Sequence, residues 1–230
     1  MALWYEKNKV VFLSPQRAAS TSIEKWLENN LNESPQGHRH HILQENEIKF
    51  MRDNDFFSFS VVRNPWARVY SHYNLEKLHG TLAMVNNTLP FNEYVDILYK
   101  AYQKISDSRT IDGFVCYSIY RHMWEEPLKG HFIPQYDKLI KDGEPVFDYI
   151  VKFEDLENEM SIIADQLGVI HSELPLYRGG RRNGKYEMDE GEGRDGILKT
   201  NSYREHYSDE SRDKLAEIYH KTIEYFNYKF

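Results

Sequence analysis

The stretch VVFLSPQRAASTSIEKW, residues 10–26, constrains the fold of this chain more than any other part of it. Its four apolar residues, Val10–Leu13, predict a short buried strand that ends at Ser14-Pro15. Small and hydroxyl residues follow, and from Ile23 onward apolar residues recur at helical spacing. A strand, a small-residue loop and a helix start present backbone N–H groups and the positive end of a helix to an anion. The stretch therefore predicts a site for a phosphate or a sulfate.

The side chains of this loop favour the same kind of ligand. Arg17 adds a permanent positive charge, and Ser20, Thr21 and Ser22 add hydroxyl donors. Residues 14–22 contain neither Gly nor Lys, so they do not form the G-x-x-x-x-G-K-[ST] loop of nucleotide kinases. A plain strand–turn–helix in which Ser20 or Thr21 caps the helix would have the same pattern. The first motif alone leaves anion binding and ordinary capping both open.

Length and composition exclude several classes of protein. A chain of 230 residues can form one domain with a sizeable core, and we expect a single domain over residues 1–230. The net charge of −7 argues against a general nucleic-acid binder. The single cysteine, Cys116, excludes a disulfide framework and is interpreted as a core residue. Because the chain has neither a membrane-spanning apolar run nor a signal-peptide h-region, we expect a soluble, cytoplasmic protein.

Strands and helices are predicted to alternate along the chain. Further strands are predicted over residues 56–62 and 149–153. Helices are predicted over residues 45–52, 91–105 and 154–167, from Pro65 to near Gly80, and from near Ser208 onward. Residues 81–145 are interpreted as a mostly helical insert, and residues 177–201 as a mobile surface loop. This order favours an α/β fold whose central sheet is mainly parallel, with helices on both faces.

A second motif, VVRNPWARVYSHYN, covers residues 61–74. Arg63 stands where a predicted buried strand gives way to a helix, which is the crevice where open α/β sheets bind ligands. Ser71 lies on that helix, with Arg68 one turn before it. A strand-end arginine and a helix hydroxyl can hold a second anionic group. The alternative is that both arginines pair with acidic neighbours and that Ser71 only packs.

The two motifs together resemble those of the PAPS-dependent sulfotransferase superfamily. The second is similar to that family's 3′-phosphate motif, R-[DN]-P-x-x-R-x-x-S-x-Y, and matches it at Arg63, Asn64, Pro65, Arg68, Ser71 and Tyr73. The first resembles the 5′-phosphosulfate loop, P-K-x-[GA]-[ST]-T-S, but has one residue more after Pro15 and Arg17 where the family usually has lysine. The C-terminal EYFNYKF, after an amphipathic helix, is also similar. The resemblance implies a P-loop-like sulfotransferase architecture, PAPS as the sulfuryl donor, PAP as the product, and no metal.

The resemblance also implies which residues hold the donor. The 5′-phosphosulfate would be bound by Arg17, Ala18, Ala19, Ser20, Thr21 and Ser22, and the 3′-phosphate by Arg63 and Ser71. Arg17 would in addition act in catalysis, by stabilising the negative charge that builds up as PAP departs. Four basic residues of the predicted mobile loop either close over PAPS, as a basic loop does in the family, or form a solvated charge run: Arg178, Arg181, Arg182 and Lys185.

A cluster of histidines is the predicted source of the catalytic base. His38-Arg39-His40 is similar to the H-x-H segment of the hexuronyl 2-O-sulfotransferases, where histidine is the proposed general base. His38 or His40 would take the acceptor's proton, and His131 is a weaker candidate. Short His-rich tracts can also be surface segments or adventitious metal sites. The likeness favours a carbohydrate hydroxyl as the acceptor, while lipid, phenol and peptide tyrosine acceptors stay open.

Two other functions remain compatible with the sequence. One is a P-loop-like nucleotide kinase, although the loop lacks the glycines and lysine of that class. The other is a non-catalytic nucleotide-binding protein of the same fold. Affinity for PAP compared with ATP separates the first from a sulfotransferase, and turnover of PAPS separates the second.

Overall fold

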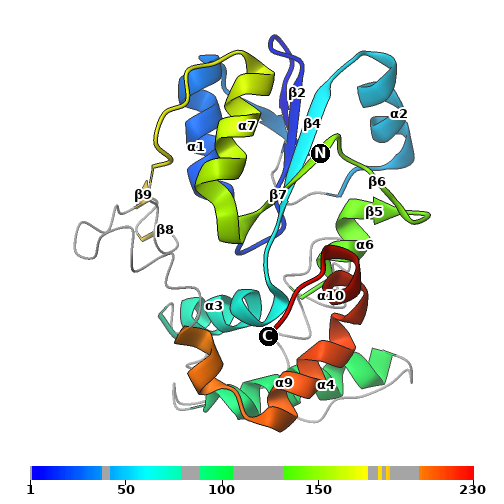
Figure 1. Cartoon of the computed structure of the whole chain (residues 1–230), viewed down its shortest axis with the longest axis vertical. Coiled ribbons are helices and arrows are strands. Elements are labelled where there is room, and N and C mark those ends of the chain that lie inside the picture. Colours follow the sequence, from blue (N-terminus) through cyan, green and yellow to red (C-terminus); the bar gives the residue numbers. More distant parts are fainter. Residues whose placement is uncertain are drawn as a thin grey trace.

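The computed structural model describes residues 2–37, 42–78, 89–105, 132–175, 181–182, 185–186 and 202–230. Figure 1 shows a central sheet between helices, with a further group of helices below it. The sheet has five strands in the order β3-β1-β2-β4-β7. Their bounds are β1 (Leu3–Tyr5), β2 (Val10–Leu13), β3 (Gln36–Gly37), β4 (Phe57–Val62) and β7 (Tyr149–Lys152). The fold is therefore mixed α/β, as predicted.

The core of the sheet is parallel. β2 pairs with β4, and β4 pairs with β7, in parallel register. Each of these strands was predicted within a residue or so, because each is an apolar or β-prone run between turn residues. On the other side of β2 the sheet continues with antiparallel β1 and β3, which were not predicted. Strands of three and two residues are too short to show a periodic pattern.

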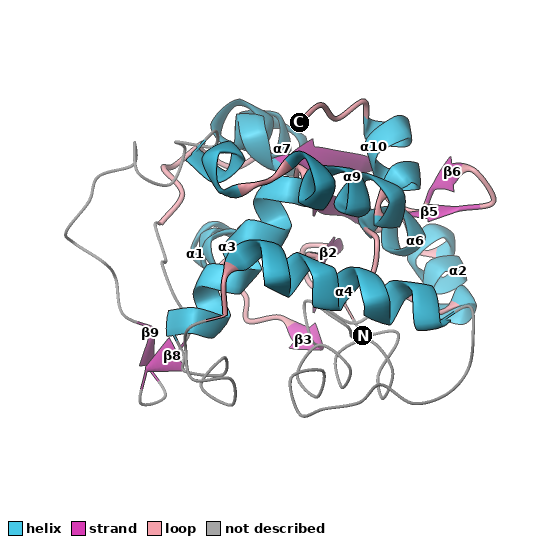
Figure 2. Ribbon diagram, turned by 90° about the horizontal axis from the view of Figure 1, so that it is seen from below, coloured by secondary structure: helices cyan, strands magenta, loops and turns pink. Residues whose placement is uncertain are grey.

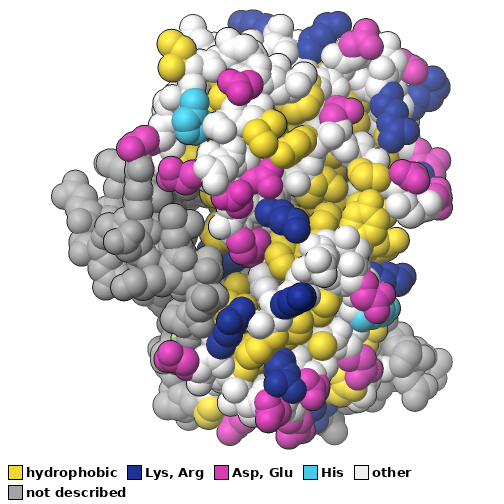
Figure 3. All heavy atoms as spheres, in the orientation of Figure 1, with side chains coloured by type: hydrophobic (Ala, Val, Ile, Leu, Met, Phe, Trp, Pro, Cys, Tyr) yellow, Lys and Arg dark blue, Asp and Glu magenta, His cyan; other side chains and the backbone are white. Residues whose placement is uncertain are grey.

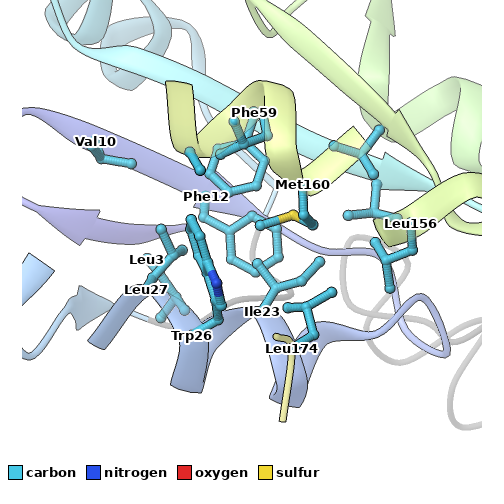
Figure 4. Close-up of a cluster of buried hydrophobic side chains, with 14 of the residues drawn as sticks. Leu3, Val10, Phe12, Ile23, Trp26, Leu27, Phe59, Leu156, Met160 and Leu174 are labelled. Atoms are coloured by element: carbon cyan, nitrogen blue, oxygen red, sulfur yellow. The ribbon is translucent and has the colours of Figure 1, made fainter. Parts of the chain in front are cut away.

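Helices cover both faces of the sheet, because side chains of successive strand residues point to opposite faces. On one face, Val10 and Phe12 pack in a cluster with residues of α1 (Ser20–Leu31) and α7 (Leu156–Leu167). Figure 4 shows this cluster, in which Ile23 and Trp26 lie beside Phe12. On the other face, Val11 and Leu13 pack with residues of α2 (Glu45–Asp53), α6 (Gln135–Leu139) and α10 (His220–Phe226). The alternation of one short strand thus builds two cores.

A third core lies beyond the end of β4, in the helical layer. It joins α3 (Pro65–Leu78), α4 (Phe91–Ile105) and α9 (Asp209–Ile218), which Figure 2 shows in front when the molecule is seen from below. The layer is rich in aromatic contacts. The ring centroids of Tyr73 and Tyr94 are 5.3 Å apart, and those of Phe91 and Tyr207 are 4.7 Å apart. Much of the aromatic content of the chain therefore serves packing.

Helix boundaries follow local signals in most places. The predicted helix over 91–105 is α4, and Ser208 caps α9 by accepting a hydrogen bond from the Ser211 N–H. The last helix, predicted as continuous, instead breaks at Tyr219 between α9 and α10. The predicted helix over 154–167 begins as a 3₁₀ turn, η3 (Phe153–Asp155), and ends at left-handed Gly168. These differences lie within correctly predicted segments.

The two predicted special regions are described only in part. Within residues 81–145, the structure describes α4, α6 and a hairpin of β5 (Ile140–Lys141) and β6 (Glu144–Pro145). Within residues 177–201, it describes the backbone of β8 (Arg181–Arg182) and β9 (Lys185–Tyr186), which pair antiparallel. In the described part of the chain, no helix has the length and apolar character that crossing a membrane requires.

Candidate functional site

The loop after β2 is folded tightly and carries backbone strain. The Ser14 hydroxyl donates to the Ala18 carbonyl at 3.1 Å, which closes the loop on itself. Arg17 and Ala19 have left-handed backbones, with φ of 66° and 56°. This conformation costs a residue other than glycine on the order of 1 kcal/mol, and it persists where surrounding contacts enforce it. The loop therefore achieves without glycine a path for which glycine is the usual residue.

The N-terminus of α1 is not capped by a side chain. Its N-cap residue is Ala19, and the structure shows no side-chain hydrogen bond to the cap position. The alternative interpretation, in which Ser20 or Thr21 caps the helix, is thus wrong. By contrast, α2 has a complete capping box at Gln44, and Ser208 caps α9. The first turn of α1 keeps backbone N–H groups and a positive dipole end that can bind an anion.

The second half of the site is a regular strand-to-helix junction. Arg63 follows β4, and the Asn64 side chain accepts hydrogen bonds from the Trp66 and Ala67 N–H groups at 3.1 and 3.3 Å. Asn64 therefore caps α3 and Pro65 occupies its first turn, as predicted. The Asn64 amide also donates to the Lys229 carbonyl at 2.9 Å. The junction is therefore tied to the C-terminal segment of the chain.

The two motifs meet in space. The Arg63 guanidinium donates through Nη1 to the Arg17 carbonyl at 2.9 Å. The Arg17 guanidinium in turn donates to the Ser71 hydroxyl, at 3.2 Å from Nε and 2.9 Å from Nη2. Arg17 was assigned to the first motif and Ser71 to the second, so their contact was not predicted. Segments about fifty residues apart in the chain therefore form one site.

Arg68 belongs to the core of this junction. It is buried, donates to the Ile133 carbonyl at 3.2 Å, and lies 5.2 Å from the Tyr219 ring. Burial lowers its pKa. Arg68 therefore packs against the aromatic layer. These packing contacts explain why an arginine stands at this position of the motif.

The site concentrates positive charge. The Arg63 guanidinium stacks at 4.2 Å on the Phe153 ring. Burial, with a smaller effect of neighbouring Arg17, lowers the pKa of Arg63 to about 10, and burial lowers that of Arg17 to about 10. Both guanidinium groups thus stay charged at neutral pH. The Arg63 Nε is buried and has no hydrogen-bond partner among the described residues. A buried donor without a partner is costly, so this atom is suited to bind an anion.

The acidic residue Glu154 lies near Arg63 but is bonded to other groups. The Glu154 carboxylate accepts hydrogen bonds from the Asn64 N–H at 2.7 Å and from the Tyr228 hydroxyl at 3.0 Å. Its negative charge raises the pKa of Arg63, but no ion pair joins the two within the described residues. Glu154 follows β7, the third parallel strand, so the reasoning that singled out Arg63 after β4 could also have found it.

Residues of α6 complete the site from a distant part of the chain. Gln135 accepts a hydrogen bond from the Arg63 N–H at 3.2 Å and donates to the Val61 carbonyl at 3.3 Å. Buried Lys138 donates to the Gln16 side chain at 2.9 Å. Burial, with a smaller contribution from Arg68, lowers the pKa of Lys138 to about 7. A helix of five residues has no usable sequence pattern, so sequence reasoning missed both side chains.

Lys138 is buried, whereas Arg17 and Arg63 are half-buried. On the face drawn in Figure 3, acidic and basic side chains are intermixed, and no broad basic surface is present there. Among the described residues, no cluster of His, Cys, Asp or Glu side chains could hold a metal ion. Several predicted residues lie outside the described residues: His38, His40, His131 and Arg178. For Arg181, Arg182 and Lys185 only the backbone is described.

Comparison with known proteins identifies the family. In a scan against models of protein families, the model described as the sulfotransferase family matches residues 2–229. Searches of curated proteins and of solved structures return no match. The family match covers nearly the whole chain, including both motifs and every described element of the site. Enzymes of this family transfer a sulfuryl group from a nucleotide donor to an acceptor. The chain belongs to the sulfotransferase family and is a sulfotransferase enzyme.

Proposed function

We propose that this enzyme uses PAPS as its donor and transfers the sulfuryl group to a hydroxyl of a carbohydrate. The hydrogen bond from Arg63 to the Arg17 carbonyl carries the proposal, because it unites two anion-binding elements at the ends of neighbouring parallel strands. PAPS has two separate anionic groups, a 5′-phosphosulfate and a 3′-phosphate. A site with two cationic parts suits such a ligand better than one with a single anion.

The loop of residues 14–22 would hold the 5′-phosphosulfate. Ala18 and Ala19 would contribute backbone, and Ser20, Thr21 and Ser22 would contribute N–H groups and hydroxyls at the open end of α1. Bound PAPS would supply the activated sulfuryl group. Arg17 would stabilise the negative charge on the departing oxygen, and fixed cations in a water-poor site are effective at this task. Arginine cannot act as the acid, because its guanidinium does not give up its proton at neutral pH.

Arg63 and Ser71 would hold the 3′-phosphate. The buried Arg63 Nε supports this role because it offers a donor that no described residue uses. Ser71 adds a hydroxyl from the second turn of α3. Charge-assisted hydrogen bonds of this kind are about twice as strong as neutral ones. This half of the site would distinguish PAPS from ATP, which has no 3′-phosphate.

The assignments of the catalytic base and of the acceptor rest on the sequence. The likeness of His38-Arg39-His40 to an H-x-H segment supports His38 or His40 as the base and a carbohydrate as the acceptor. A histidine can take a proton from a hydroxyl near neutral pH. We further propose a single domain over residues 1–230 and a cytoplasmic location.

Calorimetry with PAP and ATP tests the donor. We expect PAP to bind without added metal and more tightly than ATP with Mg²⁺, because only PAP places a phosphate on Arg63 and Ser71. Adenosine 5′-phosphosulfate serves as the control ligand that lacks the 3′-phosphate. Preference for ATP with Mg²⁺, with PAP ignored, would contradict the proposal and favour a nucleotide kinase.

Turnover of PAPS with a panel of sugar, phenol, lipid and tyrosine-peptide acceptors tests the rest. We expect sugars to be sulfated, and His38→Ala or His40→Ala to reduce the rate by about 10²–10⁴-fold, as loss of a general base does. His171→Ala, at an exposed position far along the chain, is the matched control. Binding of PAP without any turnover would indicate a non-catalytic protein. Full activity of both histidine variants would refute the base assignment.

A further inference from the structure

Lys138 is a buried cation that the proposed donor binding does not use. Its side chain is only 3% exposed, although it lies on a helix of five residues near the surface hairpin β5–β6. Gln135 holds this helix against the end of β4 through its bonds to the Arg63 N–H and the Val61 carbonyl. The position of Lys138 is therefore set by the same strand end that presents Arg63.

The ammonium group of Lys138 reaches the loop of residues 14–22. Nζ donates to Gln16 Oε1 at 2.9 Å, and the Gln16 side chain is 4% exposed. Gln16 directly precedes Arg17, whose strained backbone and carbonyl contact with Arg63 shape the loop. A buried side chain bonded to a buried loop residue transmits its charge and position to that loop, because neither group is screened by water.

The charged groups around Lys138 come from several elements. Arg68 of α3 acts on it directly, and Arg17 lies on the loop that it contacts. On its own helix, Asp137 interacts with His220 and Lys221 of α10. Lys141 of β5 is bonded to Glu45 of α2. Burial lowers the pKa of Lys138 to about 7, and the positive charge of Arg68 adds to this effect. At neutral pH the side chain is therefore present in both protonation states.

We propose that Lys138 is the proton-dependent cation of the donor site, which takes up a proton when the anionic donor enters the loop of residues 14–22. This inference rests on the proposed function. An anion nearby favours the charged form of a lysine, so the protonated enzyme binds the donor more tightly. Donor affinity should then fall as the pH rises above about 7. Arg17 and Arg63, with pKa values of about 10, stay charged over this range and would not produce the effect.

Calorimetry with PAP in two buffers of different ionisation enthalpy measures the proton directly. At pH 8 the phosphates of PAP are fully ionised, because their second pKa is about 6. We expect the unmodified enzyme to take up more than about half a proton for each PAP bound at pH 8, and to lose affinity several-fold between pH 6.5 and 8.5. Lys138→Met should take up no proton and show a flat pH dependence of affinity. Lys138→Arg should take up no proton, and its affinity for PAP should be the same at pH 8.5 as at pH 6.5.

Lys141→Met is the matched control, since Lys141 is an exposed lysine three residues away, and it should behave as the unmodified enzyme. Methionine fills the space of lysine without a desolvated charge, so the Lys138→Met variant should fold. If it does not, Lys138→Arg and the unmodified enzyme decide the question. Proton uptake that persists in either variant, or PAP binding without uptake in the unmodified enzyme, would overturn this inference alone. Absence of PAP binding at every pH would overturn the proposed donor as well.

Discussion

The two halves of the site are built in opposite ways. The loop of residues 14–22 has left-handed backbone at Arg17 and Ala19 and leads into a helix without a side-chain cap. The Arg63–Ser71 half is a regular strand and helix, capped by Asn64. One half offers backbone donors in a strained arrangement, while the other offers side chains on a relaxed scaffold. The two parts of the proposed anion site therefore differ in construction.

The supports of the two halves also differ. The regular half is tied to the C-terminal segment, through Asn64 to the Lys229 carbonyl and through Glu154 to the Tyr228 hydroxyl. The strained loop is supported by Ser14 within itself and by Arg63 and Lys138 from outside. The loop therefore depends on the regular half, while the regular half has anchors of its own. Substitutions in the loop should stay local, and substitutions at Arg63 should reach both halves.

Among substitutions that compare the two halves, Arg17→Ala should have the largest effect. If the strained half serves the transition state, kcat should fall by about 10²–10³-fold, as it does when a stabilising donor is removed from the site of developing charge. Steady-state kinetics with PAPS and an acceptor that the enzyme sulfates measures this fall in kcat. Arg52→Ala, on the exposed side of α2, is the control with the same change of charge. An effect on KM alone would mean that Arg17 only binds the donor. The two halves would then have the same function.

A smaller, ligand-specific effect is expected from Arg63→Ala. Loss of hydrogen bonds to a charged group costs about 1.5–3 kcal/mol, so PAP affinity should fall by about 10–150-fold. Adenosine 5′-phosphosulfate should lose less, and only because the Arg17 carbonyl loses its partner. Calorimetry with both ligands compares them. Equal losses for the two ligands would contradict a 3′-phosphate role, and Arg63→Lys shows how much of the effect is charge alone.

The smallest effect is expected from Ala19→Gly. Glycine relieves the left-handed strain, worth about 1–2 kcal/mol, but makes the unfolded chain more flexible, which costs about 0.4–1 kcal/mol. The free energy of unfolding should therefore rise by up to about 1.5 kcal/mol. Urea unfolding measures it, with Ala216→Gly inside α9 as a control that should lose about 1 kcal/mol. A loss of stability at Ala19 would show that the loop is not strained there.

Local sequence signals were sufficient for most of the elements. Four apolar residues bounded by Ser14-Pro15 are enough for β2, and Asn64-Pro65 after a β-prone run is enough for the end of β4 and the start of α3. Each signal lies within a few residues of the structure that it predicts. Arg63 could be recognised for the same reason. A residue between a buried strand and the following helix lies at the carboxyl end of that strand, which is where open α/β sheets bind ligands.

Contacts between distant segments decided the rest. The bond from Arg17 to Ser71 and the placement of Gln135 and Lys138 depend on side chains that are far apart in the chain. The sequence by itself determined the order of the parallel strands and the main helices, and it indicated two candidate anion-binding motifs. Only the tertiary structure decided that the motifs form one site and that a buried lysine joins it. The physical reason is that local patterns encode backbone conformation, whereas burial and charge depend on what the fold packs around each group.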